Sequence, residues 1–181
     1  MLACFEPFIT YWQGLRSGAL LPSREDFHPS EVRDFMGRIV IVERLSRSHF
    51  LSRLVGTEIV TRLGHEHTGK DFLNLLQTPE SRENQLAFYN AMLDQPFGSC
   101  GERDIVTNKG TYHAKVLVLP IRHAASHAGE FFAVFEFDQS LFLLSGIQFE
   151  HFGALRHHTI LDLGAGVPDA YACLPSETLP A

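Results

Sequence analysis

Residues 38–55 read RIVIVERLSRSHFLSRLV and hold the pattern on which the fold assignment depends. The β-branched run from Ile39 to Val42 is typical of a strand, and residues 50–55 form a second apolar segment of the same kind. A short polar stretch, 46–48, separates the two segments. The sequence therefore predicts an antiparallel hairpin as the first part of a sheet.

Helical patterns follow this hairpin. Residues 57–63 place their apolar side chains on one face, and Gly64 is a typical helix stop. A polar loop and a short turn over residues 72–76 lead to a longer helix, from about residue 80 to residue 93, for which Thr78 is the predicted cap. We expect these helices to pack together on the sheet.

Three more strands are predicted at residues 99–107, 111–121 and 130–138, with a hairpin turn at 108–110, which reads NKG. Helices thus lie between two groups of antiparallel strands. This order predicts an α+β fold: a five-stranded antiparallel sheet with helices packed on one face, plus an N-terminal amphipathic helix.

The chain has 181 residues, which fits a single domain at about 150 residues per domain. We divide it into an N-terminal helical cap or dimerisation segment, 1–37, a core, 38–138, and a C-terminal extension, 139–181. Glycine and proline are frequent in the extension, so we expect it to be partly loose. A chain that lacks residues 150–181 should then keep a folded core.

Composition excludes several classes of protein. The formal net charge of −6 argues against binding to nucleic acid or to an anionic membrane. The three cysteines form no CxxC pair and indicate no disulfide framework, so we expect a cytoplasmic protein. No run of about 18 apolar residues is present that would predict a membrane span.

Short motifs at defined spacing carry a family resemblance. They are RLVGTEIVTRLG at 53–64, TGKDF at 68–72, Tyr11-Trp12-x-x-Leu15-Arg16-x-Gly18, Pro22-x-Arg24, Asp26-Phe27-His28-Pro29, Tyr89 and Asp94-Gln95-Pro96. With these motifs the chain resembles the stand-alone bacterial PAS-type sensory domain family that is common in alphaproteobacteria. The resemblance covers about residues 8 to 138. It implies a PAS-like, non-enzymatic signalling module that binds a small ligand and acts through protein-protein interaction.

In such a module we expect a pocket between the sheet and the helix at 80–93. Its ligand would be small and apolar or of mixed polarity. Tyr89 and His113 would orient it by hydrogen bonds, and the other side chains would give the pocket its shape. The predicted pocket residues are Leu54, Phe72, Phe88, Tyr89, Met92, His113 and Phe135.

We expect no cofactor. Some PAS domains hold haem through a histidine on the central helix, but residues 80–93 contain none. Light-sensing PAS domains carry a reactive cysteine in an Asn-Cys-Arg-like motif, and no cysteine here has that context. We therefore expect neither haem nor a photoactive flavin.

We also expect no metal site and no catalytic residue. His65 and His67 flank Glu66, but no further metal ligands are evident nearby, so we interpret them as structural or exposed. His123, His127, His157 and His158 are expected to be exposed. The charged run 102–104 is interpreted as a surface charge ladder and the glycine-rich turn 162–166 as part of the tail.

The segment 131–137 has apolar side chains on both faces of its predicted strand, so the sheet face away from the helices needs a cover. The N-terminal helix can lie over this face of its own chain or of a second subunit. We predict a homodimer and an unidentified signalling partner. The predicted dimer interface comprises Phe5, Phe8, Ile9, Trp12, Leu15, Phe132 and Val134.

Two alternatives remain open. One is a small α+β enzyme with acid/base chemistry in the same pocket, in which His113 or His67 would be the base and would lie next to a carboxylate. The other is a structural adaptor whose core is filled by phenylalanine side chains.

Overall fold

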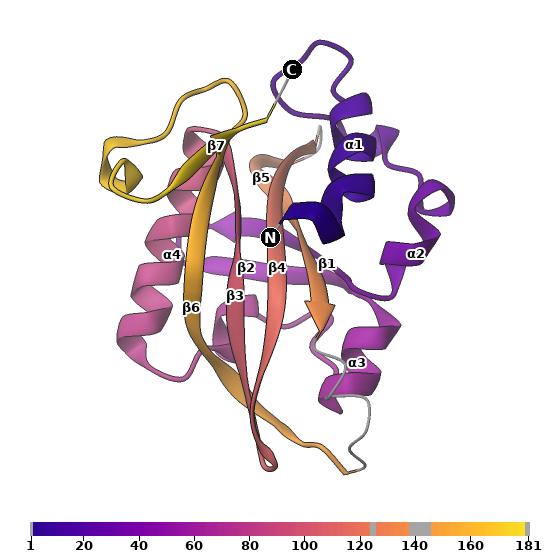
Figure 1. The fold of residues 1–181 in the computed structure, drawn as a ribbon, viewed down its shortest axis with the longest axis vertical. Helices are drawn as coiled ribbons and strands as arrows, with labels where there is room; N and C mark the ends of the chain where they lie inside the picture. The colour runs from indigo at the N-terminus through magenta and orange to yellow at the C-terminus, as the bar shows by residue number, and fades with distance from the viewer. Residues whose placement is uncertain (1, 124–125, 138–145, 180–181) are drawn as a thin grey trace.

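The computed structural model describes residues 2–123, 126–137 and 146–179 (Figure 1). Its helices are η1 (Leu2–Phe5), α1 (Glu6–Gly14), η2 (Arg24–Asp26), η3 (Pro29–Val32), α2 (Arg33–Met36), α3 (Thr57–Leu63), η4 (Phe72–Leu75), α4 (Pro79–Asp94) and η6 (Asp169–Tyr171). Its strands are β1 (Ile39–Ser46), β2 (His49–Val55), β3 (Phe97–Thr107), β4 (Gly110–His123), β5 (Ser126–Phe137), β6 (Phe149–Asp162) and β7 (Ser176–Thr178).

The strands form one sheet in the order β2-β1-β5-β4-β3-β6-β7. Neighbouring strands are antiparallel except β6 and β7, which are parallel. The predicted α+β fold is confirmed, but the predicted count of five strands is wrong because the sheet has seven. Both additional strands come from the segment expected to be a loose extension.

The sequence did not predict β6 because its side chains do not alternate regularly. Its pairing with β3 contains three register shifts. Each shift interrupts the two-residue period on which strand prediction depends. After β6, the glycine-rich turn is held by Asp162, whose Oδ1 accepts hydrogen bonds from the backbone N–H groups of Gly164 (2.8 Å) and Gly166 (3.0 Å).

The sheet carries a hydrophobic core on each face. The inner core lies between the sheet and the elements α3, η4 and α4. The outer core lies between the opposite face and the N-terminal helices. Figure 1 shows the sheet running between α4 and the N-terminal helices α1 and α2. In the described residues, no helix has both the length and the apolar character to cross a membrane.

α4 begins at a capping box, as Thr78 predicts. The Thr78 Oγ1 accepts a hydrogen bond from the backbone N–H of Ser81 at 3.1 Å, and the Ser81 hydroxyl interacts with the Thr78 backbone in return. Tyr89 and Met92 are buried on its inner side. This helix forms one wall of the site described below.

α1 covers the sheet of its own chain, the first of the two placements that the sequence allows. Trp12 is fully buried, and its Nε1 donates a hydrogen bond to the Pro120 carbonyl of β4 at 3.1 Å. The Phe8 ring lies 5.6 Å from that of Phe132 on β5. Phe5, Ile9 and Val134 are likewise buried in the outer core, and Leu15 is partly buried against it. Self-association through these residues stays a prediction, and it would require α1 to leave its own sheet.

Candidate functional site

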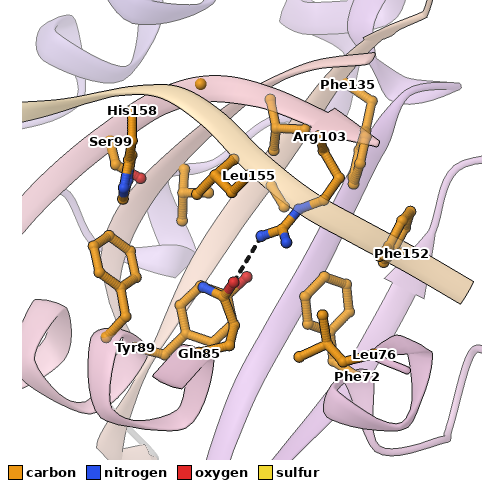
Figure 2. Close-up of a pocket in the computed structure, with 15 residues that line it drawn as sticks. Phe72, Leu76, Gln85, Tyr89, Ser99, Arg103, Phe135, Phe152, Leu155 and His158 are labelled. Atoms are coloured by element: carbon orange, nitrogen blue, oxygen red, sulfur yellow. Dashed lines mark hydrogen bonds between the residues drawn. The ribbon is translucent and has the colours of Figure 1, made fainter. Parts of the chain in front are cut away.

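A cavity of about 30 Å³ lies between α4 and strands β3 to β6, on the inner face of the sheet. Figure 2 shows its side chains converging from α4, η4 and the sheet. The cavity is lined by Phe72, Leu76, Gln85, Phe88, Tyr89, Ser99, Gly101, Arg103, Val116, Val118, Ala133, Phe135, Phe152, Leu155 and His158. Four of the seven predicted pocket residues are among them: Phe72, Phe88, Tyr89 and Phe135.

A groove of about 320 Å³ adjoins this cavity. It shares five lining side chains with the cavity: Gln85, Phe88, Arg103, Leu155 and His158. The groove and the cavity therefore lie side by side between α4 and β6. We refer to the cavity and the groove together as the α4 site.

Arg103 is the charged side chain of the α4 site. On β3, Arg103 pairs with Ala114 and Ile105 with Tyr112, and alternation places both side chains on the inner face of the sheet. The expected surface charge ladder is therefore wrong for Arg103. Ile105 lies two residues further along β3, on the same face, and belongs to the inner core. This apolar residue is the sequence signal that could have predicted the inward direction of the Arg103 side chain.

The Arg103 guanidinium has neutral partners in the structure. Its Nη2 donates to Gln85 Oε1 at 2.6 Å, and its Nη1 donates to the Gly153 carbonyl at 3.1 Å (Figure 2). Within the described residues, no carboxylate forms an ion pair with Arg103, and burial lowers its pKa. A partly buried cation with neutral partners has capacity for an anion.

His158 reaches the site through a bulge in β6. Cys100 pairs with Thr159 and Glu102 with Arg156, so two β6 residues face the single residue Gly101. A Cβ at Gly101 would lie 3.0 Å from Leu155 Cδ1 and 3.1 Å from the Arg156 carbonyl oxygen, so this close approach favours glycine.

The bulge separates the two neighbouring histidines. His157 adopts φ 49° and is exposed, as expected, whereas the prediction that His158 is exposed is wrong. The His158 ring lies 4.9 Å from the Phe88 ring, and its Nε2 has no hydrogen-bond partner. Burial, followed by the charge of Arg103, lowers the pKa of His158 to about 4.

Three predicted pocket residues do not line the α4 site. A bulge at Arg53, between the pairs Ile41–Leu54 and Val42–Ser52, turns Leu54 to the outer core. Met92 is buried in the inner core without lining the cavity. His113 lies on the other face of β4 from Ala114, and its Nδ1 is 2.9 Å from Asp104 Oδ1. The hypothesis that His113 is a base in this pocket is therefore wrong.

His67 is buried rather than placed in an open loop. It is 2% exposed, its ring centroid lies 6.4 Å from that of Phe72, and neither ring nitrogen has a hydrogen-bond partner. Burial lowers the pKa of His67 to about 4, and the neighbouring His65 contributes in the same direction. The other predicted catalytic base thus has no carboxylate bonded to it.

Comparison with known proteins decides the family. A family model described as PAS domain matches residues 3–135. The chain belongs to the PAS domain family. The predicted resemblance to PAS-type sensory domains is confirmed, and the matched range includes α1 and most of the five-stranded part of the sheet.

Solved structures similar to this PAS domain include light-sensing domains. The light-state structure of the blue-light photoreceptor Aureochrome1 LOV is 15% identical, with a TM-score of 0.39 over 62% of this chain and 91% of that chain. A structure described as "Flavin Analogue Sheds Light on Light-Oxygen-Voltage Domain Mechanism" is 14% identical, with a TM-score of 0.40 over 62% and 85%. A likeness this distant says nothing about what this chain binds. A search of curated proteins finds no match.

The cavity of this PAS domain is small when taken without the groove, and the absence of a haem or flavin stays a prediction. A cavity of about 30 Å³ has room for a few atoms, whereas ligand pockets for molecules of drug size measure about 300–1,000 Å³. Cys100 is buried in the outer core, on the other face of the sheet. The cavity and the groove together have a larger volume, of which the groove contributes about 320 Å³.

Buried His67 and partly buried His158 predict a pH-dependent stability. Their folded pKa values of about 4 lie below the unfolded value of about 6.5, so between these pH values the unfolded chain binds more protons. The free energy of unfolding should therefore fall as the pH falls from about 6.5 to about 4. Each histidine contributes a slope of up to about 1.4 kcal/mol per pH unit. Chemical denaturation at several pH values measures it.

Replacing His67 with phenylalanine should flatten this dependence. The substitution removes a titrating ring whose nitrogens form no hydrogen bonds, and it keeps an aromatic side chain beside Phe72. His28→Phe, at an exposed position, is the matched control for the exchange of a histidine for a phenylalanine. An unchanged slope in the His67 variant would show that His67 is not the group that titrates.

Proposed function

We propose that this PAS domain is a non-enzymatic sensory module that binds a small organic anion at the α4 site. Its acidic group would bind Arg103, and its apolar part would contact the phenylalanine side chains around the cavity. The protein would work in the cytoplasm and pass the signal to a partner protein or to a second copy of itself. The observation that supports this ligand class is Arg103, a partly buried cation in an apolar site whose described partners are neutral.

Four polar side chains line the cavity of the α4 site. Gln85 accepts a hydrogen bond from Arg103, and its amide nitrogen remains available as a donor. Ser99 and His158 line the same cavity. A carboxylate that binds the guanidinium would form charge-assisted hydrogen bonds, which are about twice as strong as neutral ones. An apolar lining with a few convergent polar groups is typical of a small-molecule site.

The described lining of the α4 site favours binding over catalysis. Neither the cavity nor the groove has an aspartate or a glutamate among its lining residues. A histidine that acts as a general base is normally oriented by such a group. His158 is instead held neutral by burial beside an arginine.

A ligand at this site would contact two different elements of the fold, a helix and a strand. It would contact α4 on one wall and β6 on the other, and both elements belong to the inner core. Ligand binding can shift the structure only by as much as it favours one arrangement of these elements over another. Movement of α4 against β6 is therefore the change that a partner protein would detect.

The ligand class can be tested with matched acids and amides. Benzoate and phenylacetate should raise the melting temperature of the protein and bind in calorimetry, and benzamide and phenylacetamide should bind at least tenfold more weakly. Arg103→Gln should weaken acid binding at least tenfold, because a hydrogen bond to a charged group contributes about 1.5–3 kcal/mol. Arg103→Lys should retain part of the affinity because it keeps the charge.

Arg156→Gln is the matched control for this experiment. Arg156 lies on β6 but forms an ion pair with Asp104 outside the α4 site, at 2.7 Å. This variant should bind the acids like the wild type. Equal binding of acids and amides, or unchanged acid binding by Arg103→Gln, would contradict the proposal.

A further inference from the structure

A second cluster of titratable side chains lies on the outer face of the sheet, away from the α4 site. Glu43 on β1, His123 at the end of β4 and Glu130 on β5 each direct one donor atom to a common point, and these atoms lie within 4.8 Å of one another. Glu43 and Glu130 are direct partners across the β1–β5 ladder. The cluster is therefore set by the register of three neighbouring strands.

Both carboxylates are buried, and one of them is poorly compensated. Glu43 is 8% exposed and Glu130 is 4% exposed. Like charges directly opposite each other on adjacent strands are destabilising. Arg53 binds one oxygen of Glu43. For Glu130, His123 Nδ1 lies 3.3 Å from Oε1 and Arg24 Nε lies 3.7 Å from Oε2, and Oε2 has no hydrogen-bond partner.

The three donor residues have the right chemistry for a metal ion. One imidazole nitrogen and two carboxylate oxygens form a donor set that zinc accepts, at about 2.0–2.2 Å from each donor. Tetrahedral geometry at this distance separates neighbouring donor atoms by about 3.4 Å. The His123–Glu130 distance of 3.3 Å is close to this value. The Nδ1 of His123 also has no hydrogen-bond partner in the structure.

An open groove leads to the cluster. It has a volume of about 720 Å³ and is lined in part by Glu25, Arg53, Glu43, His123 and Glu130. The groove provides a route from solvent and room for a water molecule as the fourth ligand, as in zinc sites with an open coordination position.

We propose that Glu43, His123 and Glu130 form a binding site for a divalent transition-metal ion of the zinc type. The ion adds positive charge beside the poorly compensated Glu130 and joins β1, β4 and β5 beneath the N-terminal helices. The site does not depend on a ligand at the α4 site. The sequence predicts no metal site, and it could not reveal this cluster because the three residues are far apart in the chain and only strand register brings them together.

The two nearby arginines provide a control variant for which tighter metal binding is expected. Arg24 and Arg53 repel a cation and therefore weaken its binding. Removing Arg24 should strengthen metal binding, since it leaves Glu130 with one positive neighbour fewer. If the cluster were merely an ion-pair network, Arg24→Gln would instead disturb it and create no metal affinity.

The test is calorimetric titration of tag-free protein with ZnCl₂. The wild type should bind one equivalent. Glu130→Gln and His123→Ala should each bind at least tenfold more weakly, and Arg24→Gln should bind several-fold more tightly. His113→Ala is the matched control, because His113 also lies beside a carboxylate, Asp104, on the same face. It should bind zinc like the wild type.

Three results would overturn the proposal. They are absence of zinc binding by the wild type, equal binding by all variants, and loss of affinity in the His113 variant alone. Circular dichroism melts show that each variant is folded. Because His123 is partly exposed, its variant keeps the test decisive even if Glu130→Gln fails to fold.

Discussion

A chain that ends at residue 148 should show no cooperative unfolding transition. The deletion removes β6, which pairs with β3 along nearly the whole strand, from Phe97–Asp162 to Thr107–Phe149. It also removes Phe152, Ile160 and Leu161, which are buried in the two cores. Loss of a large buried apolar side chain costs about 2–5 kcal/mol, and domains are stable by about 5–15 kcal/mol in total. Calorimetry or circular dichroism during heating measures the transition.

A shorter deletion is the matched control. Removing residues 176–181 deletes β7, whose three residues are exposed, together with Leu179, which is buried. This chain should keep a cooperative transition at a lower temperature. A cooperative transition in the longer deletion would restore the sequence-based expectation that the core ends near residue 138.

The five-stranded part of the sheet was predictable because its sequence is locally regular. The β-branched run of β1 and the hairpin turn between β3 and β4 each fix an element by short-range chemistry. The apolar side chains on both faces of β5 also predicted a cover on the outer face, which α1 provides. Regular periodicity was sufficient wherever strands paired without register shifts.

Bulges account for what the sequence could not predict. The bulge at Arg53 reverses the facing of Leu54, and the bulge opposite Gly101 turns His158 into the site while His157 stays exposed. A single inserted residue moves every following side chain to the other face, and no residue type marks its position reliably.

The sequence predicted apolar residues of the candidate site but not its charged residue. Phe72, Phe88, Tyr89 and Phe135 follow from the apolar faces of α4, η4 and β5. Arg103 is a charged residue in a charged run, and such residues are mostly exposed. Its inward direction follows from its register with Ala114, which only the paired strand reveals. The local sequence therefore does not show that a charged side chain such as Arg103 points into an apolar site.

Trp12→Ala should destabilise the protein by about 4 kcal/mol or more. The substitution empties the largest fully buried position of the outer core, and such a truncation costs about 3–5 kcal/mol. It also removes the hydrogen bond to the Pro120 carbonyl. A buried carbonyl without a partner adds about 1–3 kcal/mol. Urea denaturation followed by far-ultraviolet circular dichroism measures the loss.

Two variants separate these contributions and test what α1 does. Trp12→Phe keeps most of the packing and loses the hydrogen bond, so it should cost about half as much as Trp12→Ala. Leu20→Ala, at an apolar residue that is exposed, should change stability by less than about 0.5 kcal/mol. Sedimentation velocity of the same proteins adds the oligomeric state. A Trp12→Ala protein of unchanged stability that sediments as a smaller species than the wild type would show that Trp12 contacts a second subunit instead of its own sheet.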